Sequence, residues 1–201
     1  MIDRVERFLA AREGLVLALL LPVLLLPILA GIQHEVWVDE AYTLLRFSSN
    51  GFFYPFTDYH VPNNHILFSA LLSLWWQPGM DLLVLRAPLV AFHIASLVII
   101  YLWLRGVCGR RAALLSLLVY ASSWVIGSFA LELRGYSLSF TLVLLNCCSA
   151  WHFSRCGSEG STRVWAALYA LTAIALILTI PTNLVVVMVV DMATVAIVAV
   201  A

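Results

Sequence analysis

Apolar runs long enough to cross a lipid bilayer follow one another along most of this chain and leave little room for a soluble fold. A membrane-spanning helix needs about 20 mostly apolar residues. Only 11% of the 201 residues are charged, against roughly 25% in a soluble domain. The sequence therefore predicts an all-α, multi-pass membrane helix bundle with about six spans: 15–32, 82–104, 112–131, 136–153, 164–180 and 184–201.

The placement of arginine decides whether a shorter apolar run, at 66–76, also crosses. Cytoplasmic loops carry an excess of Lys and Arg, and here all 11 basic residues are arginine. If the short run stays at the surface, eight arginines lie on the side of the N-terminus and three on the other side; if it crosses, the division is five against six. We therefore predict six spans, a cytoplasmic N-terminus and a short helix at the outer surface.

This topology puts one long polar connection, 33–81, on the outer face. Long loops in compact proteins are often functional. Asp39 can cap an amphipathic helix that ends at Asn50-Gly51, with Glu40 favouring the helix dipole. The paired carboxylates of Asp39 and Glu40 can instead supply a general base at an acceptor hydroxyl. Both interpretations are open from composition alone.

A second polar cluster, with His60, Asn64 and His65, comes directly before the short apolar run. Amides and imidazoles at a helix N-terminus can donate hydrogen bonds to a phosphate or a sugar. A solvated turn organised by Pro62 is the alternative. A metal site is a further alternative, although the spacing matches no specific ligand motif.

Two outer arginines run against the sidedness of the others. Arg86 opens the second predicted span, and Arg134 lies between Glu132 and Tyr136 in the turn after the third. A guanidinium is suited to holding a lipid phosphate. A snorkelling anchor or an exposed ion pair would explain the same residues without a ligand. Arginine on the less basic side needs a local reason, so both residues join the candidate site.

Composition also excludes some classes of function. The 11 basic residues are balanced by 11 acidic ones, so the chain has no basic surface of the kind that binds nucleic acid. The four cysteines lack the spacing of a disulfide framework or a metal site and are interpreted as packing residues. Asp191, near the middle of the last predicted span, is a functional candidate or a contact to further helices.

Five motifs occur in an order that resembles a known family: WVDEAY, NNHILFSALLSLWW, LRAPLVAF, RGVCGRRAALL and LELRGYSL. The chain resembles, over roughly residues 10–180, the N-terminal half of the polyprenyl-phosphate-dependent glycosyltransferases of the GT-C fold, in particular the group similar to protein O-mannosyltransferases and the aminoarabinose transferase of lipid A. The resemblance implies that residues 1–201 form the N-terminal part of a GT-C transmembrane domain. It also implies juxtamembrane helices in the outer loop 33–81.

The resemblance implies a reaction as well: transfer of a sugar, with inversion, from a polyprenyl-phosphate donor to a hydroxyl of an unknown glycan, lipid or protein acceptor. Asp39, paired with Glu40, occupies the position of the family's catalytic base. Where the family often has His-Pro-Pro-Leu, this chain reads NNHIL, without either proline. The residues expected to bind the donor phosphate or the substrate are His60, Asn64, His65, Arg86, Glu132, Arg134 and Tyr136.

No metal and no other cofactor is predicted, because the leaving group is already a phosphate ester that arginines can hold. The interpretation places the protein in a bacterial plasma membrane as a multi-pass protein, with the N-terminus in the cytoplasm and the active site on the extracytoplasmic face. The alternative is a transporter or lipid-handling protein for an anionic lipid. The polar residues gather at one face and no internal repeat is visible, which favours the enzyme. The apolar ending at Ala201 leads us to expect a piece of a longer enzyme.

Overall fold

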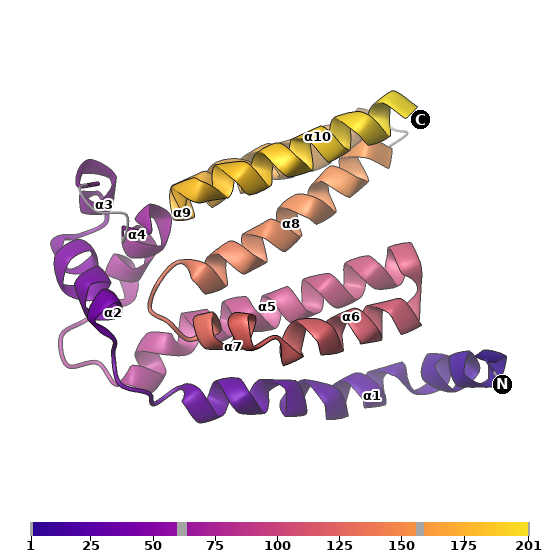
Figure 1. Cartoon of the computed structure of the whole chain (residues 1–201), viewed down its shortest axis with the longest axis horizontal. Helices are drawn as coiled ribbons and strands as arrows, with labels where there is room; N and C mark the ends of the chain where they lie inside the picture. The colour runs from indigo at the N-terminus through magenta and orange to yellow at the C-terminus, as the bar shows by residue number, and fades with distance from the viewer. Residues whose placement is uncertain (1, 60–63, 156–158, 201) are drawn as a thin grey trace.

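The computed structural model describes residues 2–59, 64–155 and 159–200, and all regular structure within these ranges is helical. The predicted all-α class is confirmed. The long helices run back and forth between the two ends of an elongated bundle (Figure 1). The elements are α1 (Ile2–Gly31), α2 (Val38–Tyr42), η1 (Thr43–Phe47), η2 (Ser48–Asn50), α3 (Tyr54–Thr57), α4 (Ile66–Trp75), α5 (Leu82–Cys108), α6 (Arg110–Ser122), α7 (Trp124–Ala130), α8 (Tyr136–Arg155), α9 (Glu159–Thr179), η3 (Pro181–Asn183) and α10 (Leu184–Val200).

Within the described residues, four helical stretches are long and apolar enough to cross a membrane: Arg12–Gly31, Leu82–Cys108, Gly160–Thr179 and Pro181–Val198. The number rises to five if α6 and α7 together form one bent span. The chain is therefore that of a helical membrane protein, as predicted. Helix α8 has 20 residues but is not among these stretches, so fewer than the six predicted spans meet this criterion.

The predicted span at 112–131 is not one continuous helix. It consists of α6 and α7, which meet at a bend of 63°. Ser123 stands at the bend with extended backbone angles, and its hydroxyl accepts a hydrogen bond from the Ile126 N–H. A serine hydroxyl can satisfy the free N–H groups of a new helix start, which explains why the helix breaks and restarts here.

The bundle has two ends (Figure 1), and they differ in charge. One end, here called the arginine-rich end, holds the start of α1, the turn from α5 to α6, the end of α8 and the start of α9. The opposite end, here called the loop end, holds α2 to α4 and the turns from α7 to α8 and from α9 to α10. The three arginines predicted to oppose the others, Arg46, Arg86 and Arg134, belong to the loop end.

The long connection folds into short helices, as expected. Helical structure from Val38 to Asn50 ends at Gly51, whose φ of 92° lies in the left-handed region that favours glycine. The predicted stop at Asn50-Gly51 is thus confirmed. The run before Trp76 forms α4, an apolar helix of 10 residues, too short to cross a bilayer of roughly 30 Å.

A leucine-rich core lies beneath the loop end and fixes the short helices to the bundle. Leu44 of η1, Phe68 of α4 and Leu85 of α5 belong to it, together with Leu133 and Leu176. Burial from water contributes about 1.5–3 kcal/mol for a buried side chain of this kind, which applies to Leu44 and Leu133 in the connections and not to the members within the spans. The core therefore holds together segments that are far apart in the sequence, and the polar residues of the candidate site lie on these same segments.

Candidate functional site

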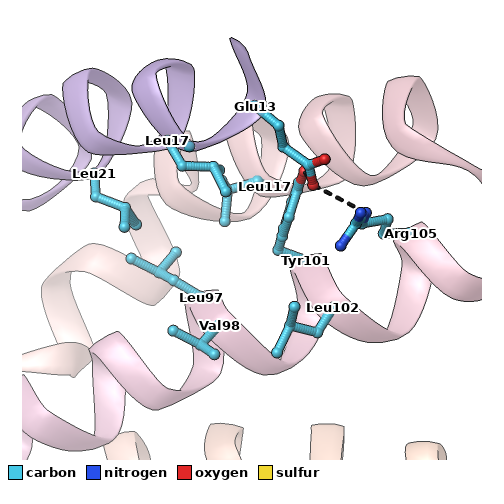
Figure 2. A pocket seen from close by; sticks show the side chains of 10 residues that line it. Glu13, Leu17, Leu21, Leu97, Val98, Tyr101, Leu102, Arg105 and Leu117 are labelled. Atoms are coloured by element: carbon cyan, nitrogen blue, oxygen red, sulfur yellow. Dashed lines mark hydrogen bonds and ion pairs between the residues drawn. The ribbon is translucent and has the colours of Figure 1, made fainter. Parts of the chain in front are cut away.

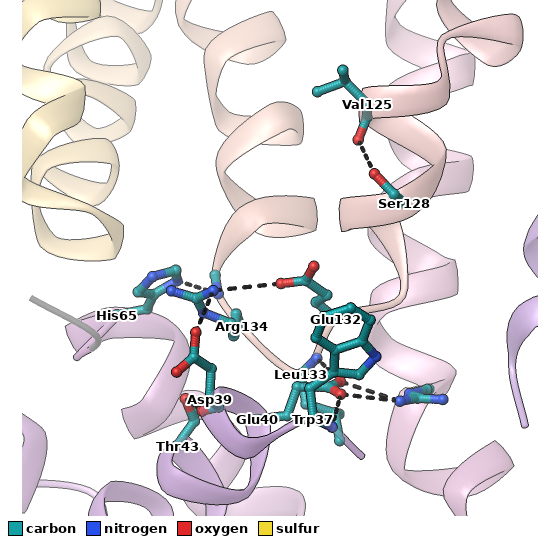
Figure 3. Close-up of polar contacts among 12 residues, drawn as sticks. Trp37, Asp39, Glu40, Thr43, His65, Val125, Ser128, Glu132, Leu133 and Arg134 are labelled. Atoms are coloured by element: carbon teal, nitrogen blue, oxygen red, sulfur yellow. Dashed lines mark hydrogen bonds and ion pairs between the residues drawn. The ribbon is translucent and has the colours of Figure 1, made fainter. Parts of the chain in front are cut away.

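The candidate residues gather at the loop end, where the start of α2, the turn 131–135 and the start of α4 meet (Figure 3). Asp39 and Glu40 come from α2, Glu132 and Arg134 from the turn, and His65 from the residue before α4. Figure 3 shows these side chains converging from segments that are 25 to 95 residues apart in the sequence. The structure thus brings together residues that the sequence had only listed.

The start of α2 determines where the two acids lie. Trp37, not Asp39, occupies the N-cap position, and its backbone N–H donates to Glu40 Oε2 at 2.8 Å. The expectation that Asp39 caps this helix is therefore wrong, because the helix begins one residue before it. Successive residues on a helix are about 100° apart, so Asp39 and Glu40 leave α2 in different directions.

Glu40 lies inside the protein and is paired with Arg86. The Glu40 side chain is 1% exposed and that of Arg86 is 2% exposed. Arg86 Nη2 donates to Oε1 at 3.2 Å and to Oε2 at 3.3 Å, and the Leu133 N–H donates to Oε1 at 2.7 Å. With the Trp37 N–H, both carboxylate oxygens are satisfied. We call Glu40–Arg86 the buried pair.

Arg86 has further protein partners. Its Nη1 donates to the carbonyls of Ile32, at 2.9 Å, and His34, at 2.7 Å. These contacts tie the end of α1 and the start of the loop to α5. A phosphate would need access to the guanidinium, and a side chain with 2% exposure and both terminal nitrogens occupied does not offer it. The predicted role of Arg86 in holding a phosphate therefore does not fit this arrangement, and the side chain instead braces the fold.

Asp39 points the other way, toward solvent and Arg134. Its carboxylate is 59% exposed and lies 3.3 Å from Arg134 Nη1. The same nitrogen lies 3.6 Å from Glu132 Oε2, and the Arg134 and Glu132 side chains are 15% and 24% exposed. We call Asp39–Arg134 the open pair. It places an accessible carboxylate beside a guanidinium at the surface of the loop end.

Arg134 is not saturated by its protein partners. Its guanidinium lies over the Tyr136 ring, 4.9 Å from the centroid, a cation–π arrangement that orients the side chain. Its Nε has no hydrogen-bond partner among the described residues. Burial raises the pKa of the neighbouring Glu132 carboxyl above its usual value, an effect that the positive charge of Arg134 opposes. The Nε of Arg134 is buried, as is the Nε of Arg86, which likewise has no partner among the described residues. Arg134 differs from Arg86 because its side chain is 15% exposed against 2%, which leaves part of the guanidinium accessible to another anion.

His65 forms the floor of the site as a neutral ring. It is 2% exposed, and its Nδ1 accepts a hydrogen bond from the Gly135 N–H at 2.6 Å. Burial, reinforced by the charge of Arg134, lowers the pKa of His65 from 6.5 to about 3. Because Nδ1 accepts, the neutral ring carries its proton on Nε2. His65 can therefore donate a hydrogen bond near neutral pH, but it does not contribute a positive charge.

The close contact between His65 and the turn requires glycine at position 135. A Cβ atom built there would lie 2.8 Å from Thr179 Cγ2 and 2.9 Å from His65 Nδ1. Tyr136 then packs edge-on against the His65 ring, with centroids 4.9 Å apart. The turn is thus held against α4 by one hydrogen bond and one ring contact, and these set the position of Arg134.

Two predicted residues remain: Asn64, which has a structural role, and His60, whose position is not described. Asn64 is completely buried, and its Nδ2 donates to the carbonyls of Pro55, at 2.7 Å, and Asp58, at 2.9 Å. It holds the loop together and does not face the open pair. His60 lies outside the described residues. Metal ligation has no geometric support within the described ranges, where no three His, Cys, Asp or Glu residues gather.

Sequence reasoning missed the groups that make Glu40 unavailable. Three of them are backbone or distant groups: the N–H of Trp37, the N–H of Leu133 and the guanidinium of Arg86. A backbone N–H has no signature in the sequence. The one usable signal was that Glu40 occupies the third residue of a helix, where a Glu side chain often accepts from the N-cap N–H.

Comparisons with known proteins identify no relative of this chain. No protein-family model matches the chain, and neither a curated protein nor a solved structure matches it.

Proposed function

We propose that the protein is a membrane glycosyltransferase of the GT-C type that transfers a sugar from a polyprenyl phosphate to an acceptor hydroxyl on the extracytoplasmic face. The observation that carries the proposal is the open pair: an exposed carboxylate, Asp39, 3.3 Å from a partly exposed guanidinium, Arg134. A base for the acceptor and a cation for the phosphate are the two groups that this transfer needs.

In the proposed reaction the acceptor hydroxyl oxygen attacks the anomeric carbon of the sugar. Asp39 takes the hydroxyl proton as the new glycosidic bond forms, and the bond from the anomeric carbon to the phosphate oxygen breaks. The bonding electrons leave with the polyprenyl phosphate, whose added negative charge Arg134 stabilises. Attack from the side opposite the leaving group inverts the anomeric centre. The reaction as written requires no metal ion and no other cofactor.

The two acids of the DE pair then have different roles. Asp39 is the proposed catalytic base because it is accessible. Glu40 is a positioning residue, since it is 1% exposed and its oxygens already accept from Arg86 and from two backbone N–H groups. Through the Leu133 N–H, Glu40 holds the turn that carries Arg134. Neutral His65 supports the same turn by accepting the hydrogen bond from the Gly135 N–H.

We further propose that α6 with α7, and also α8, cross the membrane, giving six spans. Helix α8 is 20 residues long, about 30 Å at 1.5 Å per residue. Its polar side chains form hydrogen bonds inside the bundle: Thr141 with Ser96, Asn146 with Thr172, and Ser139 with Asn183. An internal position explains a less apolar sequence without a different topology. The arginine-rich end then faces the cytoplasm.

Transfer measured with and without the Asp39 carboxylate tests the enzyme proposal. Membranes containing the protein are incubated with a panel of labelled polyprenyl-phosphate sugars, and the release of sugar from the donor is followed. We expect Asp39→Asn to lower the rate by about 10²–10⁴-fold, the usual contribution of a general base. Glu35→Gln is the matched control, since Glu35 is an exposed carboxylate of the same loop. Undiminished transfer by Asp39→Asn would overturn the assignment of the base.

A second outcome separates the enzyme from a lipid-handling protein. If the wild type binds or moves polyprenyl-phosphate sugars without breaking the sugar–phosphate bond, the chain is a carrier of anionic lipid and not a transferase.

Sidedness is tested with single cysteines at Ser161 and Asn50 in a cysteine-free chain. A membrane-impermeant thiol reagent added to intact cells should label the Asn50→Cys protein and not the Ser161→Cys protein. Labelling of Ser161→Cys would contradict the six-span topology.

A further inference from the structure

A groove between α1 and α5 lies far from the loop end, near the arginine-rich end (Figures 1 and 2). It has a volume of about 330 Å³, within the roughly 300–1,000 Å³ of ligand pockets. Leu17 and Leu21 of α1 face Leu97, Val98 and Leu102 of α5 across it, as Figure 2 shows. The interior is therefore suited to a hydrocarbon chain.

The mouth of the groove is polar and carries a net positive charge. Glu13 Oε1 accepts from the Tyr101 hydroxyl at 2.6 Å and lies 2.9 Å from Arg105 Nε. Glu13 Oε2 accepts from Arg110 Nε at 2.9 Å. One carboxylate thus faces two guanidinium groups. Arg105 lines the groove, and Arg110 contacts the same carboxylate from the start of α6.

Both arginines keep their terminal nitrogens available. Arg105 and Arg110 contact Glu13 through Nε, and among the described residues their Nη atoms donate no hydrogen bond. The side chains are 40% and 36% exposed. Paired N–H donors of this kind match the oxygens of a phosphate. The mouth therefore offers an anion site above an apolar channel.

We propose that this groove binds an anionic glycerophospholipid, with the phosphate on the Nη groups of Arg105 and Arg110 and one acyl chain along the leucines. A neutral lipid would fill the channel but would leave the two arginines without a counter-charge.

Helix α1 has little of its surface inside the protein. Only 6% of its membrane stretch Arg12–Gly31 is buried inside the protein. An acyl chain between α1 and α5 would add apolar contact to both helices. The proposal is independent of the glycosyltransferase assignment, because the groove and the open pair are at opposite ends of the bundle.

Native mass spectrometry of the purified protein, titrated with phosphatidylglycerol or phosphatidylcholine, tests the proposal. We expect the first phosphatidylglycerol to be retained more tightly than phosphatidylcholine, and Arg105→Gln with Arg110→Gln to weaken it on the order of tenfold. Arg155→Gln with Arg163→Gln is the matched control, since it removes the same charge from the end of α8 and the first part of α9. Equal retention of both lipids by the wild type, or an equal loss in the control, would overturn the proposal.

A second variant tests the groove without a change of charge. Gly14 lines the groove, and a Cβ atom there would meet nothing within 4 Å. Gly14→Trp should fill the mouth and weaken retention of phosphatidylglycerol on the order of tenfold, with the thermal unfolding of the protein in lipid-free detergent unchanged. Full retention of phosphatidylglycerol by a folded Gly14→Trp protein would show that the lipid binds elsewhere.

Discussion

Asp39 and Glu40 are neighbours in the sequence, and each forms an ion pair with an arginine, yet the two pairs have opposite surroundings. The buried pair joins side chains that are 1% and 2% exposed, whereas the open pair joins side chains that are 59% and 15% exposed. In both pairs a carboxylate meets a guanidinium, and the N–O distances are nearly equal, 3.2 Å and 3.3 Å. Access to solvent therefore distinguishes a carboxylate that stabilises the fold from one that can contact a substrate.

The physical reason lies in solvation. Removing two charges from water costs several kcal/mol for each ion, and the cost is recovered only with good geometry and additional hydrogen bonds. Glu40 has these additional bonds, from the N–H groups of Trp37 and Leu133. An exposed pair loses little solvation and gains little, typically about 0–1 kcal/mol.

Breaking the buried pair should have the largest effect on stability. Glu40→Gln leaves Arg86 as an uncompensated buried charge, and loss of one partner of such a pair costs about 3–5 kcal/mol. Thermal or denaturant unfolding in a fixed detergent measures the change. Glu35→Gln, at an exposed carboxylate of the same loop, should change the unfolding free energy by less than about 0.5 kcal/mol. Equal stability of the two variants would show that Glu40 is not a bracing residue.

Gly135→Ala should disturb the open pair while leaving the buried pair in place. The new methyl group would lie 2.8 Å from Thr179 Cγ2 and 2.9 Å from His65 Nδ1, so the turn carrying Arg134 must shift. Overpacking of this kind costs about 1–3 kcal/mol. The transfer rate should also fall, because Arg134 moves relative to Asp39.

Gly127→Ala is the control for the added methyl group. Gly127 lies in α7, and a Cβ there would meet nothing within 4 Å. This substitution should be neutral, or stabilising by about 0.4–1 kcal/mol. If Gly135→Ala behaves in the same way, the close approach of the turn to His65 does not determine the site.

Much of the fold could be predicted from the sequence, because apolar run length and the stop at Asn50-Gly51 depend on local physics. The helical class and the short helix α4 follow directly from them. The bend at Ser123 could not be predicted, since serine in an apolar run breaks a helix only in some packing contexts. The site was predicted as a set of residues. Its division into buried and open pairs depends on the 46-residue separation of Glu40 and Arg86, which no local pattern encodes.

The pH dependence of the unfolding free energy tests whether the His65 ring is buried away from water. His65 has a pKa of about 3 in the folded protein against 6.5 for an unperturbed histidine. Below pH 6.5 the unfolded chain binds a proton that the folded protein does not, so the stabilisation is full above pH 6.5 and declines as the pH falls toward 3. The expected loss is up to about 1.4 kcal/mol per pH unit.

His65→Gln isolates this contribution, because a glutamine oxygen can still accept from the Gly135 N–H and does not titrate in this range. The unfolding free energy is measured from pH 7 to pH 4.5 for both proteins. The wild type should lose stability more steeply than the variant as the pH falls. Parallel curves would indicate that His65 is hydrated, and the site would then be more open than the structure indicates.

The smallest stability effect is expected where the effect on transfer is largest, at the open pair. Asp39→Asn should change the unfolding free energy by about 0–1 kcal/mol, since its carboxylate is 59% exposed. A double-mutant cycle with Arg134→Gln measures the coupling directly, and we expect it to stay below about 1 kcal/mol. A coupling of about 3 kcal/mol or more would mean that the open pair is a second brace. Because the Asp39 carboxylate stabilises the fold so little, its charge has no structural role at this position. The carboxylate remains available to a ligand, and this is the property that a catalytic base requires.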